Sequence, residues 1–338
     1  MNTLAARTEK NLADIVHLAI RHRLASKALV VFDGQTPLSR LIADGYRAAL
    51  PEGIFIDFDD AEPGAVLAAI EALTAGDLVI LVQSASFRLN EFRFRIELFS
   101  RGLATIEHLH LGRSSSDEQM EVYVDALAYD RNYYIGLGHG LKKKLDAAKM
   151  VTVRCRGTTL AYEGGMEPAK LNIGDYSDMK NVGGTFPIGE VFSEPTDLSK
   201  ANGEAMLFGY AGMDHLIQIH EPFKVKIENG VLTAGDDAPE SFRAILELIR
   251  KQEDVLVREF GLGLNRAMGK NRIVNDITAF ERQKGLHLSL GEKHGIYKKP
   301  GFNPKKTRYH IDVFVDVERI EVDGEAIFAE GDFLPPSK

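Results

Sequence analysis

The 338-residue sequence contains a single cysteine, Cys155. One cysteine cannot form an intramolecular disulfide, which fits a reducing cytoplasm, and it cannot supply a thiolate metal cluster. Any metal site in this chain must therefore be built from histidine, aspartate and glutamate. That set of donors suits zinc, manganese, cobalt or iron better than copper(I).

Long apolar runs and excess positive charge are also missing. No apolar segment reaches the length of a membrane span. Near the N-terminus, Arg7, Glu9 and Lys10 interrupt what would be the apolar region of a signal peptide. The formal net charge of −8 gives no basis for nucleic-acid binding and disfavours an anionic membrane surface. We therefore expect a cytoplasmic protein with neither nucleic acid nor membrane as a partner.

The first half of the sequence alternates between short buried strands and amphipathic helices. Four apolar runs are typical of strands: residues 27–33, 53–59, 77–84 and 104–112. Helix-length patterns lie between them, and a longer helical region is expected at about 117–148. Alternation of this kind predicts a mostly parallel sheet covered by helices. We assign residues 1–149 to this α/β domain.

From Met150 onward the pattern changes to hairpins. Asn229-Gly230 and Asp323-Gly324 each lie between alternating apolar residues, which is a strong hairpin signal. One helix, at about 238–259, interrupts the strands. Residues 150–338 are therefore predicted to form a second, antiparallel-rich α+β domain.

The stretch "RYHIDVFVD" places a histidine and an aspartate two residues apart in a predicted strand. His310 and Asp312 then point to one face, and the other face is apolar. Either the polar face is solvated, or the two side chains converge on a ligand. Three other candidate ligands lie earlier in the same domain, in segments marked by glycine: Glu190 in "TFPIGEVFSEP", Glu259 in "VREFGLGLN" and His287 in "GLHLSLGEKHGIY".

Taken singly, each of these residues has an ordinary interpretation as a solvated carboxylate, a charge at a helix end or a core histidine. The same ordinary interpretation is assigned to four further histidines: His108, His110, His215 and His220. Taken together, the five candidates comprise three carboxylates and two imidazoles. That is about the number of ligands that two hydrolytic metal ions share when a carboxylate bridges them.

At these same residues the sequence resembles the metallo-aminopeptidases typified by aminopeptidase T and the staphylococcal aminopeptidase S. The resemblance covers about 150–335. Four segments are similar to ligand-bearing segments of that family: "NVGGTFPIGEVFSEP", "REFGLGLN", "GLHLSLG" and "YHIDVFV". The resemblance implies five metal ligands: Glu190, Glu259, His287, His310 and Asp312.

The resemblance also implies a reaction. It predicts a hydrolase that cleaves an N-terminal peptide bond or a small amide with a metal-activated water. The cofactor would be two divalent ions of zinc, cobalt or manganese, and the assembly would be a homodimer. Glu190 or Glu259 would bridge the ions or act as general base. The family's active-site tyrosine has two candidate replacements here, His294 and Tyr297.

A second family widens the choice. The ring-cleaving 2,5-dihydroxypyridine dioxygenases are similar in fold and hold one iron(II) through two histidines and one aspartate. Their H-x-D pair corresponds to His310 and Asp312. Their remaining histidine falls where this chain has Glu259, which favours the hydrolase. A mononuclear iron(II) dioxygenase is the alternative.

Overall fold

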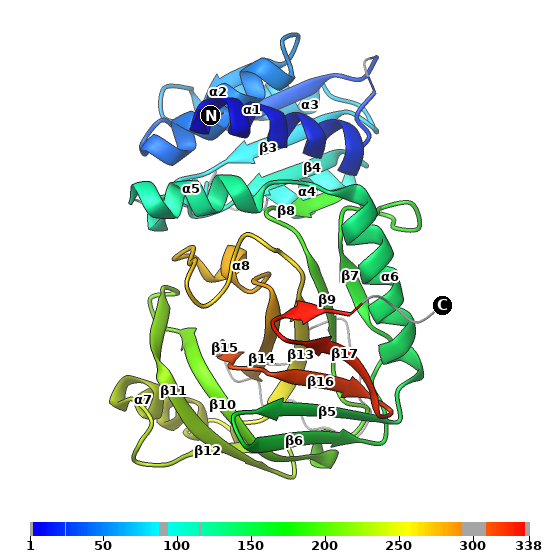
Figure 1. The fold of residues 1–338 in the computed structure, drawn as a ribbon. Helices are drawn as coiled ribbons and strands as arrows, with labels where there is room; N and C mark the ends of the chain where they lie inside the picture. Colours follow the sequence, from blue (N-terminus) through cyan, green and yellow to red (C-terminus); the bar gives the residue numbers. More distant parts are fainter. Residues whose placement is uncertain (1–2, 24, 88–93, 115, 293–308, 335–338) are drawn as a thin grey trace. The chain divides into compact units, whose positions relative to one another are not determined.

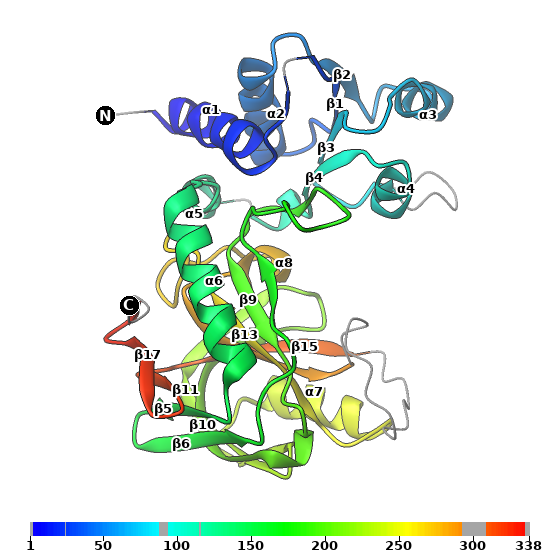
Figure 2. The ribbon, with the colours of Figure 1, turned by 90° about the vertical axis from the view of Figure 1, so that its right-hand side faces the viewer.

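The computed structural model describes residues 3–23, 25–87, 94–114, 116–292 and 309–334 (Figures 1 and 2). Contacts divide the chain into two compact units. The first comprises Met1–Ile135, Gly174–Ile188 and Arg272–Ala279, and the second comprises Gly136–Ile173, Gly189–Asn271 and Phe280–Lys338. The boundary expected after residue 149 stays a prediction; in this division by contacts, residues 136–149 belong to the second unit and two segments of the second half belong to the first.

The first unit is built on a parallel sheet with strand order β2-β1-β3-β4-β8. Its strands are β1 (Ala28–Phe32), β2 (Ile54–Asp57), β3 (Leu78–Val82), β4 (Ala104–His108) and β8 (Gly183–Thr185). The first four confirm the predicted strands. The fifth was not predicted: β8 pairs with β4 and so satisfies hydrogen-bonding groups at an otherwise open edge. Gly183 permits this pairing, since a Cβ there would lie 1.9 Å from the carbonyl oxygen of Thr105.

Helices flank this sheet along the chain. They are α1 (Leu4–Asp14), continued by one π-helical turn (Ile15–Ala19), α2 (Pro37–Ala49), α3 (Pro63–Glu71), α4 (Phe94–Ser100), a short 3-10 turn (Leu111–Arg113), α5 (Asp117–Ala126) and α6 (Arg131–Ala147). The helical region expected at 117–148 is thus two helices, and the second crosses the boundary between the units. Helix α2 begins at Pro37 because Thr36 and Ser39 form a capping box and proline suits the first helical position.

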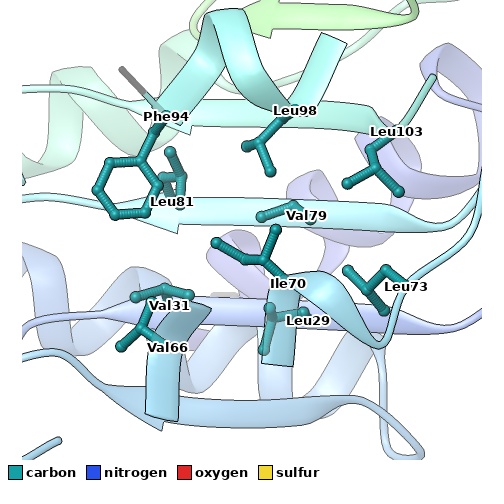
Figure 3. Packing of buried hydrophobic residues seen from close by; sticks show 10 residues of the cluster. All are labelled: Leu29, Val31, Val66, Ile70, Leu73, Val79, Leu81, Phe94, Leu98 and Leu103. Atoms are coloured by element: carbon teal, nitrogen blue, oxygen red, sulfur yellow. The ribbon is translucent and has the colours of Figure 1, made fainter. Parts of the chain in front are cut away.

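An apolar cluster fixes helices α3 and α4 to one face of this sheet (Figure 3). Leu29 and Val31 of β1 point toward it, as do Val79 and Leu81 of β3, because alternate residues of a strand share a face. Helices α3 and α4 contribute Val66, Ile70, Phe94 and Leu98. Burial of each such side chain contributes roughly 1.5–3 kcal/mol. This packing holds the ends of the strands, and the loops that follow them, in place.

The second unit is built on a large antiparallel sheet. Its strand order is β18-β17-β16-β5-β6-β10-β15-β14-β13-β9-β7, and β11 and β12 continue from β10. The strands are β5 (Met150–Cys155), β6 (Thr158–Glu163), β7 (Lys170–Asn172), β9 (Glu190–Ser193), β10 (Ala201–Ala211), β11 (Ile217–Glu228), β12 (Val231–Ala234), β13 (Val257–Gly263), β14 (Gly285–Gly291), β15 (His310–Val315), β16 (Arg319–Val322), β17 (Glu325–Ala329) and β18 (Asp332–Phe333). A parallel sheet with helices and an antiparallel-rich sheet are the two architectures that the sequence predicted.

The two hairpins marked by Asn-Gly and Asp-Gly are confirmed. Asn229 and Gly230 join β11 to β12 with φ values of 51° and 78°, and Asp323 and Gly324 join β16 to β17 with 50° and 85°. Two consecutive positive φ values are the signature of the tight turn that matches strand twist. Asparagine, aspartate and glycine tolerate this conformation at low cost.

The helix predicted at 238–259 is wrong at its C-terminal end. Helix α7 covers only Glu240–Arg250, and β13 begins at Val257. Phe260 and Leu262 are fully buried in this strand, which pairs with β9 on one side and β14 on the other. Glu259 is therefore a strand residue and not a charge at a helix end. The remaining helical segments are a 3-10 turn (Leu198–Lys200) and α8 (Ile277–Phe280).

No helix in the described ranges is long and apolar enough to cross a membrane.

Candidate metal centre

One face of four adjacent strands in the second unit carries all five predicted ligands. Residues opposite one another in neighbouring strands share a face. The pairs that define this face are Glu190 with Gly263, Gly261 with His287, Glu259 with Ser289, Ser289 with Asp312, and Gly291 with His310. The sequence "RYHIDVFVD" left two possibilities, a solvated polar face or side chains that converge on a ligand. The second is favoured, because His310 and Asp312 lie on the face that also presents His287.

Glu190, Glu259 and His287 form the innermost group. One ligand atom from each lies within 4.8 Å of the others. Nε2 of His287 is 3.3 Å from Oε1 of Glu190 and 3.3 Å from Oε1 of Glu259. All three residues are buried. Buried carboxylates need a compensating cation, and Nε2 of His287, which is close to both, can bind either a proton or a metal.

His310 and Asp312 form a second pair on the same face. Nε2 of His310 is 3.3 Å from Oδ1 of Asp312, and the hydroxyl of Ser289 donates to that same oxygen over 2.6 Å. The side chain of Asp312 is buried, whereas that of His310 is 37% exposed. His310 therefore marks the side on which this group of residues meets solvent.

The carboxylates raise the pKa of both imidazoles. Burial would lower the pKa of His287, but the carboxylates of Glu190 and Glu259 outweigh it and raise this pKa to about 10. The carboxylate of Asp312 raises the pKa of His310 to about 9 despite burial. In the absence of metal, both rings carry a proton at neutral pH. A divalent cation bound at these nitrogens would displace those protons.

The carboxyl groups respond in the opposite direction. Burial would raise the pKa of Asp312, but His310 and then His287 hold it well below its usual range. For Glu190, burial is outweighed by the Arg282 guanidinium and by His287, so its pKa is also lowered. Both carboxyls are thus ionised at neutral pH, which is the state that coordinates a metal.

The absence of a side chain at Gly261 leaves the space that the imidazole of His287 occupies. A Cβ at position 261 would lie 2.1 Å from both Cε1 and Nε2 of His287, so no larger residue fits without moving the ring. Nδ1 of His287 is buried and has no hydrogen-bond partner within the described part of the chain. The ring is therefore oriented by packing against the strand and not by the outer acceptor that metal-bound histidines usually have.

Two further residues of this site were not anticipated from the sequence. Ser289 holds Asp312 and could have been found by alternation, because it stands two residues after His287 in the same strand. Arg282 lies 3.8 Å from Oε2 of Glu190 and also pairs with Glu281. No local pattern singled out Arg282. Its guanidinium faces one oxygen of Glu190 while His287 faces the other.

The donor set fits a divalent metal ion. It consists of carboxylate oxygens and imidazole nitrogens without sulfur, which is a zinc, cobalt, manganese or iron environment. Three carboxylates converge with two imidazoles on one face of the sheet. His294 and Tyr297, the candidates for an active-site proton donor, lie outside the described residues.

His108 fits the ordinary interpretation given to it. It is fully buried in the first unit, with Nε2 2.7 Å from the Tyr46 hydroxyl and Nδ1 3.0 Å from the Tyr123 hydroxyl. Burial lowers its pKa to about 3, so the ring is neutral. It is a hydrogen-bonded core residue.

Comparison with known proteins yields matches in structure only. No family model matches the sequence, and no curated protein does. Among solved structures, the 2,5-dihydroxypyridine dioxygenase of Pseudomonas putida KT2440 superposes with a TM-score of 0.65 at 16% identity, covering 99% of each chain. AmpT, the aminopeptidase T of Thermus thermophilus, superposes with a TM-score of 0.60 at 12% identity, covering 98% of this chain and all of that one.

These likenesses establish the fold over nearly the whole chain. Both neighbours are enzymes, one a dioxygenase and one an aminopeptidase. They are the two families that the sequence resembles, so that expectation is confirmed at the level of fold. A likeness in fold does not assign a reaction, so the chemistry of this chain must be argued from its own residues.

Proposed function

We propose that this protein is a metal-dependent hydrolase that cleaves an N-terminal peptide bond or a small amide. The supporting observation is the placement of Glu259. Its Oε1 lies 3.3 Å from Nε2 of His287, in a buried group that also contains Glu190. With Asp312, three carboxylates supply the negative charge that two divalent ions require, whereas an oxygenase triad uses one.

In this proposal the ions would be held by five residues: Glu190, Glu259, His287, His310 and Asp312. Divalent ions in such sites lower the pKa of a bound water toward neutrality and polarise a carbonyl group. Glu190 or Glu259 would hold the position between the ions or accept the proton of the water on a carboxylate oxygen. Arg282 would keep Glu190 ionised, and Ser289 would orient Asp312.

Three further parts of the proposal concern substrate entry, the proton donor and the assembly. His310 is the partly exposed member of the group, so substrate is proposed to enter on its side. His294 or Tyr297 would donate a hydrogen bond to the oxyanion of the tetrahedral intermediate. We further propose that the protein is cytoplasmic and that it is a homodimer. Sedimentation of the 37.4-kDa chain would test the homodimer directly.

One observation favours a second function. His287, His310 and Asp312 lie on the neighbouring strands β14 and β15, and they comprise the two histidines and one carboxylate of a mononuclear iron(II) oxygenase. The dioxygenase also gives the higher of the two TM-scores, 0.65 against 0.60. The alternative is therefore an iron(II) ring-cleaving dioxygenase in which Glu190 and Glu259 are not ligands.

The deciding experiment measures metal content and both reactions on one preparation. Protein purified without added metal is analysed for its elements, then stripped and reloaded with zinc, cobalt, manganese or, anaerobically, iron(II). Each form is offered amino-acid amides and dihydroxypyridines, while released amine and consumed dioxygen are followed. Amide cleavage by the zinc, cobalt or manganese form is expected. Dioxygen uptake confined to the iron form, without amide cleavage by any form, would establish the alternative.

A further inference from the structure

The loops that follow β3 and β4 meet at the carboxyl edge of the parallel sheet in the first unit. In the strand order β2-β1-β3-β4, the chain adds β2 on one side of β1 and then β3 and β4 on the other side. The order in which strands are added therefore reverses between β1 and β3. Open parallel sheets bind ligands at the carboxyl ends of strands beside such a reversal. The metal centre, by contrast, is built entirely from residues of the second unit.

Three side chains lie in contact, one after another, in these loops. The hydroxyl of Ser86, after β3, lies 2.9 Å from Nε2 of His110, after β4. Nδ1 of the same imidazole lies 3.3 Å from Oδ1 of Asp276, an ion-pair contact, and 3.4 Å from Nη1 of Arg113. The order is an exposed hydroxyl, an imidazole that is 22% exposed and a carboxylate that is 3% exposed. This is the arrangement by which a base, oriented by a buried acid, activates a serine nucleophile.

The surrounding backbone fixes that geometry. His110 adopts a left-handed conformation with φ of 54°, which turns the chain at the end of β4. The backbone N–H groups of Leu111 and Gly112 donate to the carbonyls of Gln83 and Ser84, at 2.9 and 3.0 Å. The loop bearing the base is thereby joined to the loop bearing the hydroxyl at two points, and the Ser86–His110 distance does not depend on side chains alone.

Arg113 and the backbone of Ser86 complete the site. Arg113 donates to Asp276 over 2.6 Å, which compensates the buried charge and holds the carboxylate against His110. In the described portion of the chain, the N–H of Ser86 has no acceptor. The N–H of an attacking serine is a donor that stabilises the oxyanion in acyl transfer. His108, only two residues from His110, cannot serve as a base because tyrosine hydroxyls engage both of its ring nitrogens.

We propose that Ser86, His110 and Asp276 form a second, metal-independent site for acyl transfer from small activated esters. Oγ of Ser86 attacks the ester carbonyl carbon while its proton passes to Nε2 of His110. The bond to the leaving alcohol breaks, and the alcohol takes that proton. A water molecule, deprotonated by His110, then attacks the acyl group on Ser86, releasing the carboxylic acid and returning the proton to the serine. Asp276 positions His110 through its contact with Nδ1 and stabilises the imidazolium that forms.

The test uses the full-length chain after chelation of metal, so that the site in the second unit contributes nothing. The probes are p-nitrophenyl acetate and a fluorophosphonate, with the modified peptide identified by mass spectrometry. Ser86 is expected to carry the label, and Ser86→Ala should reduce labelling and ester cleavage at least about tenfold. The matched control is Ser100→Ala, because Ser100 is also exposed and its hydroxyl donates to the carbonyl of Glu97, within its own helix. Equal labelling of Ser86→Ala and the unaltered chain would overturn the proposal.

A second set of variants separates catalysis from structure. His110→Gln should slow acylation about 10²-fold. If that variant or Asp276→Asn does not fold, Ser86→Cys keeps the test decisive, since Cys155 is buried and the new thiol dominates alkylation by iodoacetamide. The thiol beside His110 should react at least about tenfold faster than that of Ser100→Cys at the same pH. Equal rates would mean that His110 does not act as a base, and the three residues would then serve only to join the loops.

Discussion

Two buried histidines, one in each unit, show how neighbours decide what an imidazole does. His108 and His287 are both fully inaccessible to solvent. The pKa of His108 is lowered to about 3 by burial, whereas the pKa of His287 is raised to about 10 because two carboxylates outweigh burial. Burial alone therefore does not distinguish a core residue from a candidate metal ligand.

The difference lies in what the partners can accept and donate. With the proton on Nδ1, His108 accepts from Tyr46 and donates to Tyr123, whose own hydroxyl donates to the carbonyl of Phe186. Every group is satisfied while the ring is neutral. Nε2 of His287 lies 3.3 Å from two carboxylate oxygens. This nitrogen must therefore bind a proton or a metal, whereas the His108 ring in the first unit needs neither beyond its neutral form.

The largest expected effect is on the second region. Glu259→Gln keeps the volume but removes a charge that would bind metal, so turnover should fall about 10³-fold, or roughly 4 kcal/mol of transition-state stabilisation. Metal content and amide hydrolysis are measured together, with circular dichroism as the check on folding. Glu163→Gln, an exposed glutamate in β6, is the matched control. A folded Glu259→Gln protein with near-normal turnover would remove Glu259 from the ligand set.

The next effect is on the first region and concerns stability. His108→Ala should lower the free energy of unfolding by about 3 kcal/mol, because it leaves a cavity and removes the partner of the buried Tyr46 hydroxyl. Metal affinity should not change. Chemical denaturation and metal titration measure the two quantities, and His17→Ala, at an exposed position, is the control. A loss of metal without a loss of stability would reverse the roles assigned to the two histidines.

His108 also predicts a pH dependence in the same experiment. The unfolded chain takes up a proton at this residue near pH 6.5, but the folded chain does so only near 3. Between these values the unfolded state binds more protons, so stability falls as pH falls. In His108→Ala this part of the pH dependence should be absent.

A smaller effect tests how His287 is placed. Gly261→Ala puts a methyl group 2.1 Å from the ring atoms of His287, so the imidazole must move away from Glu190 and Glu259. We expect metal affinity to fall by about 10- to 100-fold, as when outer support of a ligand is lost. Gly269→Ala is the control, since a Cβ there meets no atom within 4 Å. Unchanged affinity in Gly261→Ala would show that the ring position is not critical.

The smallest expected effect is the change in metal affinity for each unit of pH. With pKa values of about 10 and about 9, His287 and His310 are protonated at neutral pH in the metal-free protein. Bound metal must displace these protons, so affinity should rise with pH by up to about tenfold per unit for each proton displaced. Calorimetric titration in two buffers of different ionisation enthalpy counts the protons. A pH-independent affinity between about pH 6 and 8 would contradict ligation by these histidines.

In the metal-free protein, His287 gives stability a pH dependence opposite in direction to that of His108. The interaction of His287 with its carboxylates stabilises the fold fully below about pH 6.5, where the unfolded ring is also protonated. It is lost as pH rises through about 10, where the folded ring deprotonates. Thermal melts of metal-free protein across this range would show the decline, and bound metal should abolish it.

Local sequence was sufficient for much of this. Short apolar runs predicted β1 to β4, and Asn229-Gly230 and Asp323-Gly324 predicted their hairpins, because these signals depend on neighbours within a few residues. Alternation also placed His310 and Asp312 on one face before any partner was known. The other ligand candidates were first indicated by their Gly-marked segments, and the resemblance to known families then implied that they are ligands.

Tertiary structure alone decided the rest. The entry of β8 into the first sheet, the strand that holds Glu259, and the contact of Glu190 with His287 all depend on pairing between distant segments. So does the meeting of Ser86 with Asp276 through His110. Such pairings are selected by backbone hydrogen bonds and by packing across the whole sheet, and the periodicity of a single segment carries no information about which distant segment will lie beside it.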